Sequence, residues 1–209
     1  MMAVMTVRYV PPEIADDMLG LNALPDRLLT VDDLEHLWSS LPENGYRYEL
    51  DDGVLVVYGA PSLLHQLALS RLTAFLSSAC PPEFLVIPGP GVEISPIQYR
   101  IPDLTVVRTD TVDLRSQNYA QPPALAVEIA SPSTGRYDQT RKKQVYAEFA
   151  VPDYWIVTPD AQKPDITAFR LDGKHYERVA YASGESTFTA TRPLPVSFAA
   201  AELVSAGQT

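Results

Sequence analysis

Two apolar runs of the chain each carry a single carboxylate, and a basic segment follows the second run. Asp103 stands at the start of the first run, Glu128 lies inside the second, and Lys142 and Lys143 lie in the basic segment. A carboxylate in an apolar run is costly to bury unless a cation compensates it. Two such carboxylates on neighbouring strands, with an ammonium group nearby, can hold a hard divalent cation and activate a water molecule on it. We therefore take metal-assisted hydrolysis as the hypothesis.

The basic segment is predicted to be a helix that Asp138 caps and that runs to about Phe149. In this register Lys142 shares a face with Val145, Tyr146 and Phe149, at positions i+3, i+4 and i+7. Lys143 points about 100° away from that face. If the apolar face packs on a sheet, Lys142 is directed inward and Lys143 is the more solvated lysine.

A second helix is predicted from Leu63 to about Ala79, with Ser62 as its N-cap and a broad apolar face. His65 and Gln66 lie in its first turn. Either side chain can hydrogen-bond a neighbouring carboxylate or meet solvent. Both are secondary candidates for the site, as is Gln144 on the basic helix.

A β-hairpin is predicted at residues 46–58, because the turn Asp51-Asp52-Gly53 separates two strand-like runs. Glu49 points to the face opposite Tyr48 and Leu50. Strand geometry favours a solvated Glu49, and the alternative is a third carboxylate directed at the site.

The remaining patterns complete one mixed domain of helices and strands. Thr30 is a predicted N-cap for a short helix, and strands are expected near residues 84–87, 92–94, 152–157 and 187–189. A second hairpin is expected at residues 166–181, and the apolar tail 193–204 is expected to dock. Residues 1–26 show no sustained period and are predicted to be an irregular arm, which leaves residues 27–209 as a single domain.

Charge and composition narrow the classes of protein. The formal net charge is −10, which counts against broad electrostatic attraction to nucleic acid but not against a nuclease, since a carboxylate-lined site is itself acidic. Cys80 is the single cysteine, the start of the chain has no secretory pattern, and the apolar stretches are only strand-sized. We expect a cytoplasmic protein that does not enter a membrane.

Other chemistries lack their residues. The sequence has no Cys/His cluster for zinc, no glycine-rich phosphate loop and no GxSxG elbow. Ser131 and Ser133 flank Pro132 in a turn-like cluster with no histidine at a motif-like spacing, so we interpret them as turn residues.

Six motifs in order resemble a known group of proteins. They are Tyr48-Glu49-Leu50-Asp51-Asp52-Gly53, His65-Gln66, Ile101-Pro102-Asp103, Glu128-Ile129-Ala130-Ser131-Pro132-Ser133, the set Asp138, Lys142 and Tyr146, and Val151-Pro152-Asp153-Tyr154-Trp155. Over about residues 27–200 the chain resembles the PD-(D/E)XK nuclease superfamily, and within it the bacterial Uma-type family, whose members are described as "putative restriction endonucleases". The resemblance implies a restriction-endonuclease-like fold, with a central mixed β-sheet flanked by helices and the site where the Asp103 and Glu128 strands lie side by side.

The resemblance also implies roles for the residues. Asp103 and Glu128 match metal ligands, Glu49 matches a further acidic ligand, and the main-chain carbonyl of Ile129 can complete the set. The cofactor implied is Mg²⁺, with Mn²⁺ as a substitute, and the substrate is nucleic acid, with DNA the expected class. The superfamily lysine stands two residues after the glutamate, where this chain has Ala130, so Lys142 takes that role.

Two alternatives stay open at this point. In the first, Glu128 and Lys142 form a partly buried salt bridge and no metal binds. In the second, the chain is a catalytically inactive nuclease fold that acts as an assembly or regulatory module. Arg141 and Lys143 are candidate contacts to nucleic acid, although a solvated helix face explains them equally well. The apolar arm and tail suggest a homodimer.

Overall fold

The computed structural model describes residues 27–38, 46–130 and 135–205, with only the backbone of residues 135–139. The predicted arm at residues 1–26 and the predicted turn at Ser131 and Ser133 lie outside these residues. The chain divides into two compact units. Unit 1 comprises Met1–Ala60, Gly91–Ile101 and Asn118–Ala120, and unit 2 comprises Pro61–Pro90, Pro102–Gln117 and Gln121–Thr209. The prediction of a single domain stays a prediction.

Unit 1 is a five-stranded sheet with one short helix. The sheet has the order β2-β1-β5-β4-β7, and only the β4–β7 pair is parallel. The elements are α1 (Val31–Trp38), β1 (Arg47–Asp51), β2 (Val54–Tyr58), β4 (Gly91–Ser95), β5 (Gln98–Arg100) and β7 (Asn118–Tyr119). The buried core of this unit consists of Leu29, Val31, Leu34, Leu37, Tyr48, Leu50, Leu55, Val57 and Tyr99.

Local sequence signals explain the first elements of unit 1. The Thr30 hydroxyl accepts a hydrogen bond from the Asp33 amide at 3.2 Å, and the Asp33 carboxylate accepts from the Thr30 amide at 2.8 Å, so the predicted cap is confirmed. Hydrogen bonds from Arg27 and Thr30 hold the pKa of Asp33 well below its usual range. The predicted hairpin is confirmed as well, and its turn residues Asp52 and Gly53 both have positive φ, at 49° and 78°.

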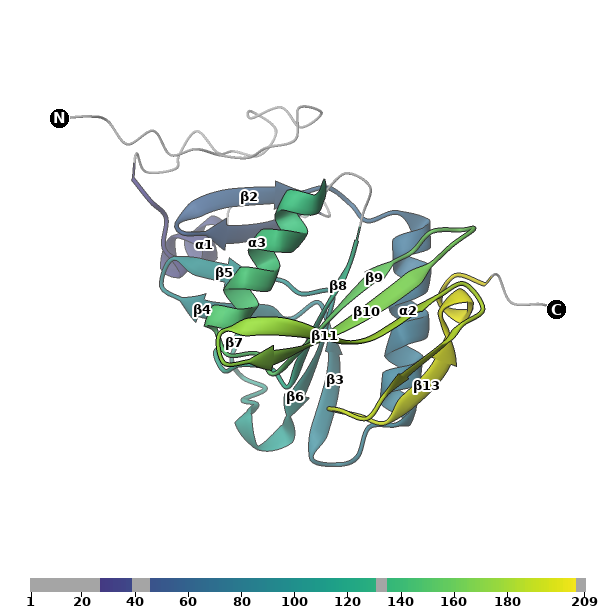
Figure 1. Cartoon of the computed structure of the whole chain (residues 1–209). Helices are drawn as coiled ribbons and strands as arrows, with labels where there is room; N and C mark the ends of the chain where they lie inside the picture. The colour runs from purple at the N-terminus through teal and green to yellow at the C-terminus, as the bar shows by residue number, and fades with distance from the viewer. Residues whose placement is uncertain (1–26, 39–45, 131–134, 206–209) are drawn as a thin grey trace. The chain divides into compact units, whose positions relative to one another are not determined.

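Unit 2 carries a six-stranded sheet of order β11-β10-β9-β8-β6-β3 and a separate β12–β13 ribbon (Figure 1). Its elements are α2 (Leu63–Ser78), β3 (Phe84–Pro88), β6 (Leu104–Arg108), η3 (Thr109–Thr111), β8 (Leu125–Ile129), α3 (Gly135–Glu148), β9 (Asp153–Thr158), β10 (Asp165–Asp172), β11 (His175–Ser183), β12 (Thr187–Ala190), β13 (Val196–Ala199) and η4 (Ala200–Leu203). Strands β8 and β9 are parallel neighbours, and α3 is the crossover between them. The other pairs in this sheet are antiparallel.

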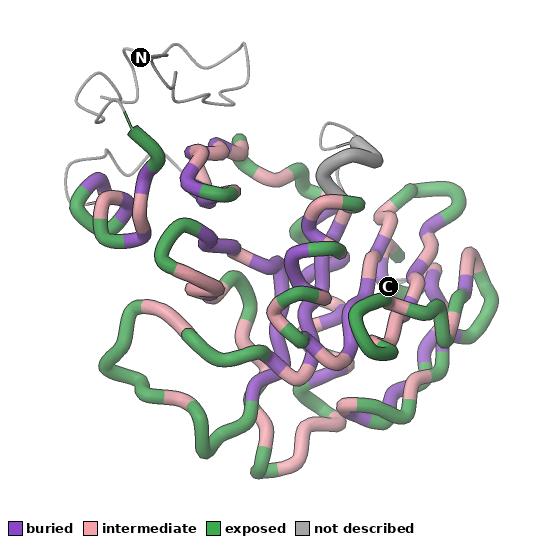
Figure 2. Tube along the Cα trace, turned by 60° about the vertical axis from the view of Figure 1, so that its left-hand side comes forward, coloured by how far each residue is buried: buried purple, intermediate pink, exposed green. Residues whose placement is uncertain are grey.

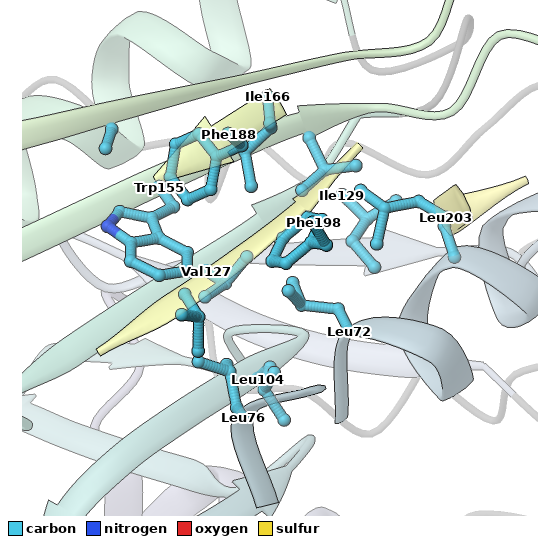
Figure 3. Packing of buried hydrophobic residues seen from close by; sticks show 14 of the residues in the cluster. Leu72, Leu76, Leu104, Val127, Ile129, Trp155, Ile166, Phe188, Phe198 and Leu203 are labelled. Carbon is cyan, nitrogen blue, oxygen red and sulfur yellow. The ribbon is translucent and has the colours of Figure 1, made fainter. Parts of the chain in front are cut away.

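Helices α2 and α3 cover opposite faces of the six-stranded sheet. All five residues of β8 are buried, and along a strand successive side chains point to opposite faces. Leu125, Val127 and Ile129 join the core that also contains Leu72 and Leu76 of α2 (Figure 3). The side chain of Glu128 points the other way, to α3. Figure 2 shows the buried residues along the inner strands and exposed residues along the turns.

The C-terminal segment closes the core on the α2 side. Phe188, Phe198 and Leu203 pack in one core with Trp155 and residues of α2 (Figure 3). The rings of Phe75 and Phe198 stack with their centroids 4.6 Å apart. The predicted docking of the apolar tail is therefore confirmed. None of the helices that the structure describes is long and apolar enough to cross a bilayer.

The predicted N-cap of α3 is wrong. Helix α3 begins at Gly135, so Asp138 lies inside the helix and is not its N-cap. Strands β3 and β4 flank a tight turn at Gly89 and Pro90 but belong to different sheets, because β3 pairs with β6 and β4 pairs with β5.

Candidate functional site

Asp103 stands directly before β6, the strand that pairs with β8, and Glu128 lies in β8. Strands β6 and β8 pair with Leu104 opposite Val127 and Thr105 opposite Ala126, so Asp103 and Glu128 each adjoin the last pair of this ladder. The Oδ2 atom of Asp103 accepts a hydrogen bond from the Ile129 amide at 2.8 Å. Asp103 is only 4% exposed. The side chain of Asp103 therefore accepts the hydrogen bond of the last amide of β8, which a main-chain carbonyl would accept in a regular sheet.

Glu128 is held from α3 by two side chains. The Lys142 Nζ lies 3.0 Å from Oε2, and the Tyr146 hydroxyl donates to Oε1 at 2.7 Å. Glu128 and Lys142 are each 8% exposed, and Tyr146 is fully buried. Lys142 and Tyr146 are four residues apart, so both project from one face of α3 onto the strand. The predicted inward direction of Lys142 is confirmed.

His65 approaches Asp103 from α2. Its Nε2 atom lies 3.2 Å from Asp103 Oδ2, and the residue is 6% exposed. The helix begins where the sequence predicts, since the Ser62 hydroxyl accepts from the His65 amide at 3.2 Å. The Nδ1 atom of His65 is buried and has no hydrogen-bond partner among the described residues.

The structure thus brings together two buried carboxylates, one ammonium group and one imidazole at the ends of β6 and β8. The carboxylate oxygens and the Ile129 carbonyl are the kind of ligand that Mg²⁺ prefers. In the described part of the chain, no group of three or more His, Cys, Asp or Glu side chains is arranged to hold a metal ion. The metal ligands predicted from the sequence stay a prediction.

Glu49 belongs to unit 1 and is bound within it. Its Oε2 lies 3.3 Å from Arg100 Nη1, and its Oε1 accepts from the Ile101 amide at 3.1 Å. Arg100 also contacts Asp51 at 2.6 Å. The solvated position that strand geometry favours is wrong, because Glu49 is 1% exposed and a cation compensates its burial. Its predicted place among the metal ligands stays a prediction.

The remaining polar candidates differ in how far they are exposed and in what they contact. Gln66 is exposed, and exposed Gln144 donates to Glu148 at 2.8 Å on the same helix. The Lys143 Nζ lies 3.5 Å from the centroid of the Phe169 ring, and partial burial lowers the pKa of Lys143. Arg141 is half-buried. The contacts given for Gln144 and Lys143 do not join them to Asp103 or Glu128. The place of Gln66 and Gln144 in the site stays a prediction, as does contact of Arg141 and Lys143 with nucleic acid.

Tyr146 is the residue that sequence reasoning placed without a functional role. Its spacing places it on the apolar face of the helix. Its hydroxyl nevertheless reaches Glu128. The signal was present in the sequence, since Tyr146 follows Lys142 by four residues and must share its direction.

Comparisons with known proteins agree with this fold. The solved structure of a "putative nuclease belonging to DUF820" from Anabaena variabilis is similar with a TM-score of 0.65 and 16% identity, over 84% of this chain and 97% of that one. A comparison with curated proteins found no match. Residues 32–203 match the Uma2 family, which is described as "Putative restriction endonuclease". The match covers most of the chain, and the chain belongs to the Uma2 family.

Proposed function

We propose that this chain is a metal-dependent nuclease that hydrolyses phosphodiester bonds of DNA, with Mg²⁺ as cofactor and Mn²⁺ as a substitute. The observation that carries the proposal is the hydrogen bond from the Ile129 amide to Asp103, because it holds one buried carboxylate against the peptide that adjoins Glu128. Membership of the Uma2 family supports nucleic acid as the substrate.

The donor set fits a magnesium ion. Mg²⁺ is usually bound by one or two carboxylates and keeps several waters, so Asp103, Glu128 and the Ile129 carbonyl would suffice, with Glu49 as a further proposed ligand. When bound, the ion supplies a water of lowered pKa and neutralises charge on the phosphate. The residues of the chain would fix the two carboxylates and keep bulk water from them, since both are nearly fully buried.

Lys142 would stabilise the negative charge that develops on the phosphate oxygens in the transition state. Its ammonium group compensates Glu128 in the structure described here. With substrate bound, the same group can donate to an oxygen on phosphorus, where a fixed cation in a dry site stabilises the transition state. Tyr146 would keep Glu128 oriented through its hydroxyl. Arg141 and Lys143 are the proposed phosphate contacts on α3.

The test is a cleavage panel of plasmid DNA, single-stranded DNA and RNA with Mg²⁺, Mn²⁺ or chelator. We expect cleavage of DNA that depends on the metal and falls about 100-fold or more in Glu128→Gln. Asp153→Asn is the matched control, because Asp153 is a buried acid of the same sheet that pairs with Arg170 at 3.2 Å, away from the site. Equal loss in both variants, or no cleavage by the wild-type chain under any condition, would contradict the proposal.

A second candidate function is an inactive nuclease fold that serves in assembly or regulation. It is favoured by the contacts of Glu128, since Lys142 and Tyr146 engage both of its oxygens. Calorimetric titration of the wild-type chain with Mn²⁺ separates the two candidates. Saturable binding that Glu128→Gln abolishes supports the nuclease, and absence of binding supports the inactive module.

The cytoplasmic location and the homodimer predicted from the sequence stay predictions. Sedimentation velocity over a range of concentrations tests the second of them. A single monomeric species at all concentrations would rule out the homodimer.

A further inference from the structure

His65 makes a contact that the proposed chemistry does not require. It lies in the first turn of α2 and is only 6% exposed. Its Nε2 atom lies 3.2 Å from Asp103 Oδ2. This distance is within the range of N–H···O hydrogen bonds. The Ile129 amide donates to the same oxygen at 2.8 Å. Oδ2 of Asp103 therefore accepts a hydrogen bond from a main-chain amide of β8 and is in close polar contact with a ring nitrogen from α2.

Packing alone does not account for a histidine at this position. The helix face around it is made of Leu69, Leu72 and Leu76, which pack in the core of unit 2. The Nδ1 atom of His65 is buried and has no hydrogen-bond partner among the described residues, and burial of an unpaired polar atom is unfavourable. An apolar residue would avoid that cost. The contact of the other ring nitrogen with Asp103 is the feature that an apolar residue cannot supply.

We infer that His65 is a positioning residue that fixes the orientation of the Asp103 carboxylate. The amide of β8 and the ring nitrogen of α2 meet Oδ2 from different elements, and together they oppose rotation of the carboxylate about its Cβ–Cγ bond. Partners that orient a metal-ligating carboxylate typically change metal affinity or activity by about 10–100-fold when they are removed. The inference rests on the proposed function, because it assigns His65 the task of presenting Asp103 to a divalent ion.

The test compares two amides of different reach. The side-chain nitrogen of glutamine can take the place of Nε2, whereas that of asparagine is one carbon shorter and falls short of Asp103. The control is His175→Gln, because His175 is an exposed histidine of β11 in the same unit. For each protein we would measure the Mn²⁺ dissociation constant by calorimetry, kcat and KM for DNA cleavage, and the melting temperature.

We expect His65→Asn to raise the Mn²⁺ dissociation constant and lower kcat by about 10–100-fold, with KM for DNA unchanged. We expect His65→Gln to stay within about threefold of wild type, as His175→Gln does. A merely structural histidine would instead lower the melting temperature in both amide variants and leave the affinity of the folded protein for Mn²⁺ unchanged. If His65→Asn does not fold, His65→Leu, which fills the volume of the ring, takes its place.

Two failures are distinguishable. If the wild-type chain binds Mn²⁺ and cleaves DNA but His65→Asn matches it, or if His65→Gln loses as much as His65→Asn, the inference about His65 is wrong and the proposed function stands. If the wild-type chain neither binds Mn²⁺ nor cleaves, the proposed function is wrong and the role assigned to His65 falls with it.

Discussion

The Oδ2 atom of Asp103 lies 2.8 Å from the main-chain nitrogen of Ile129, so an acid at the start of one strand satisfies the last amide of its neighbour. This contact needs an oxygen acceptor but no charge. An asparagine oxygen can accept the same hydrogen bond, whereas binding of a divalent cation needs the carboxylate.

We therefore expect Asp103→Asn to melt within about 4 °C of wild type, the shift that roughly 1 kcal/mol produces in a chain of this size. Its affinity for Mn²⁺ should fall at least tenfold, measured by calorimetry beside the Asp153→Asn control. Wild-type affinity in Asp103→Asn would remove Asp103 from the metal site.

Lys142 is expected to have opposite effects on binding and on turnover. Its ammonium group is 3.0 Å from Glu128 and competes with a metal ion for the same carboxylate. Lys142→Met should therefore tighten Mn²⁺ binding while cleavage falls by about 100-fold. Calorimetry and initial rates check the two signs, with exposed Lys174→Met as the control. Weaker Mn²⁺ binding in Lys142→Met would show that the lysine supports the metal site and does not compete with it.

Tyr146 is expected to contribute to stability through its hydroxyl alone. The hydrogen bond to Glu128 is 2.7 Å long and buried, and bonds to a charged group contribute about 2 kcal/mol. Tyr146→Phe keeps the ring beside Tyr154 and should lower the free energy of unfolding in urea by about that amount. Tyr181→Phe, at an exposed position, should change it by less than about 0.5 kcal/mol. Equal changes in the two variants would show that the hydroxyl contact adds little.

Glu49 is expected to balance Arg100, whatever else it binds. Arg100 is 2% exposed, and removal of one partner of a buried ion pair typically costs about 3–5 kcal/mol. Asp51 also contacts Arg100, so the loss in Glu49→Gln should lie at the lower end of this range. We expect its free energy of unfolding in urea to fall by about 3 kcal/mol. A parallel loss of Mn²⁺ affinity would place Glu49 among the metal ligands, and unchanged affinity would limit it to Arg100. Unchanged stability would contradict the ion-pair role.

Local signals predicted much of the fold and part of the candidate site. Ser62 and Thr30 cap their helices as expected, and the choice of Lys142 over Lys143 followed from helical register alone. The neighbouring placement of the Asp103 and Glu128 strands came from resemblance to a family, since residues so far apart in the sequence give no local sign of pairing.

What the sequence did not predict depends on distant partners. Glu49 is buried because Arg100, far along the chain, lies beside it, and alternation along one strand carries no information about that cation. The His65 contact was left open for the same reason, since its partner comes from another element.

Asp103 and Glu128 are contacted by different helices that cover opposite faces of the six-stranded sheet. His65 of α2 contacts Asp103, and Lys142 of α3 contacts Glu128. Local opening of a protein proceeds by cooperative segments that differ in free energy. A fluctuation that frees α3 would therefore expose Glu128 to water and let the amides of that helix exchange, while Asp103 keeps its contacts with β8 and α2. Hydrogen exchange followed segment by segment can resolve these two events, and the acids need not gain access to solvent at the same time.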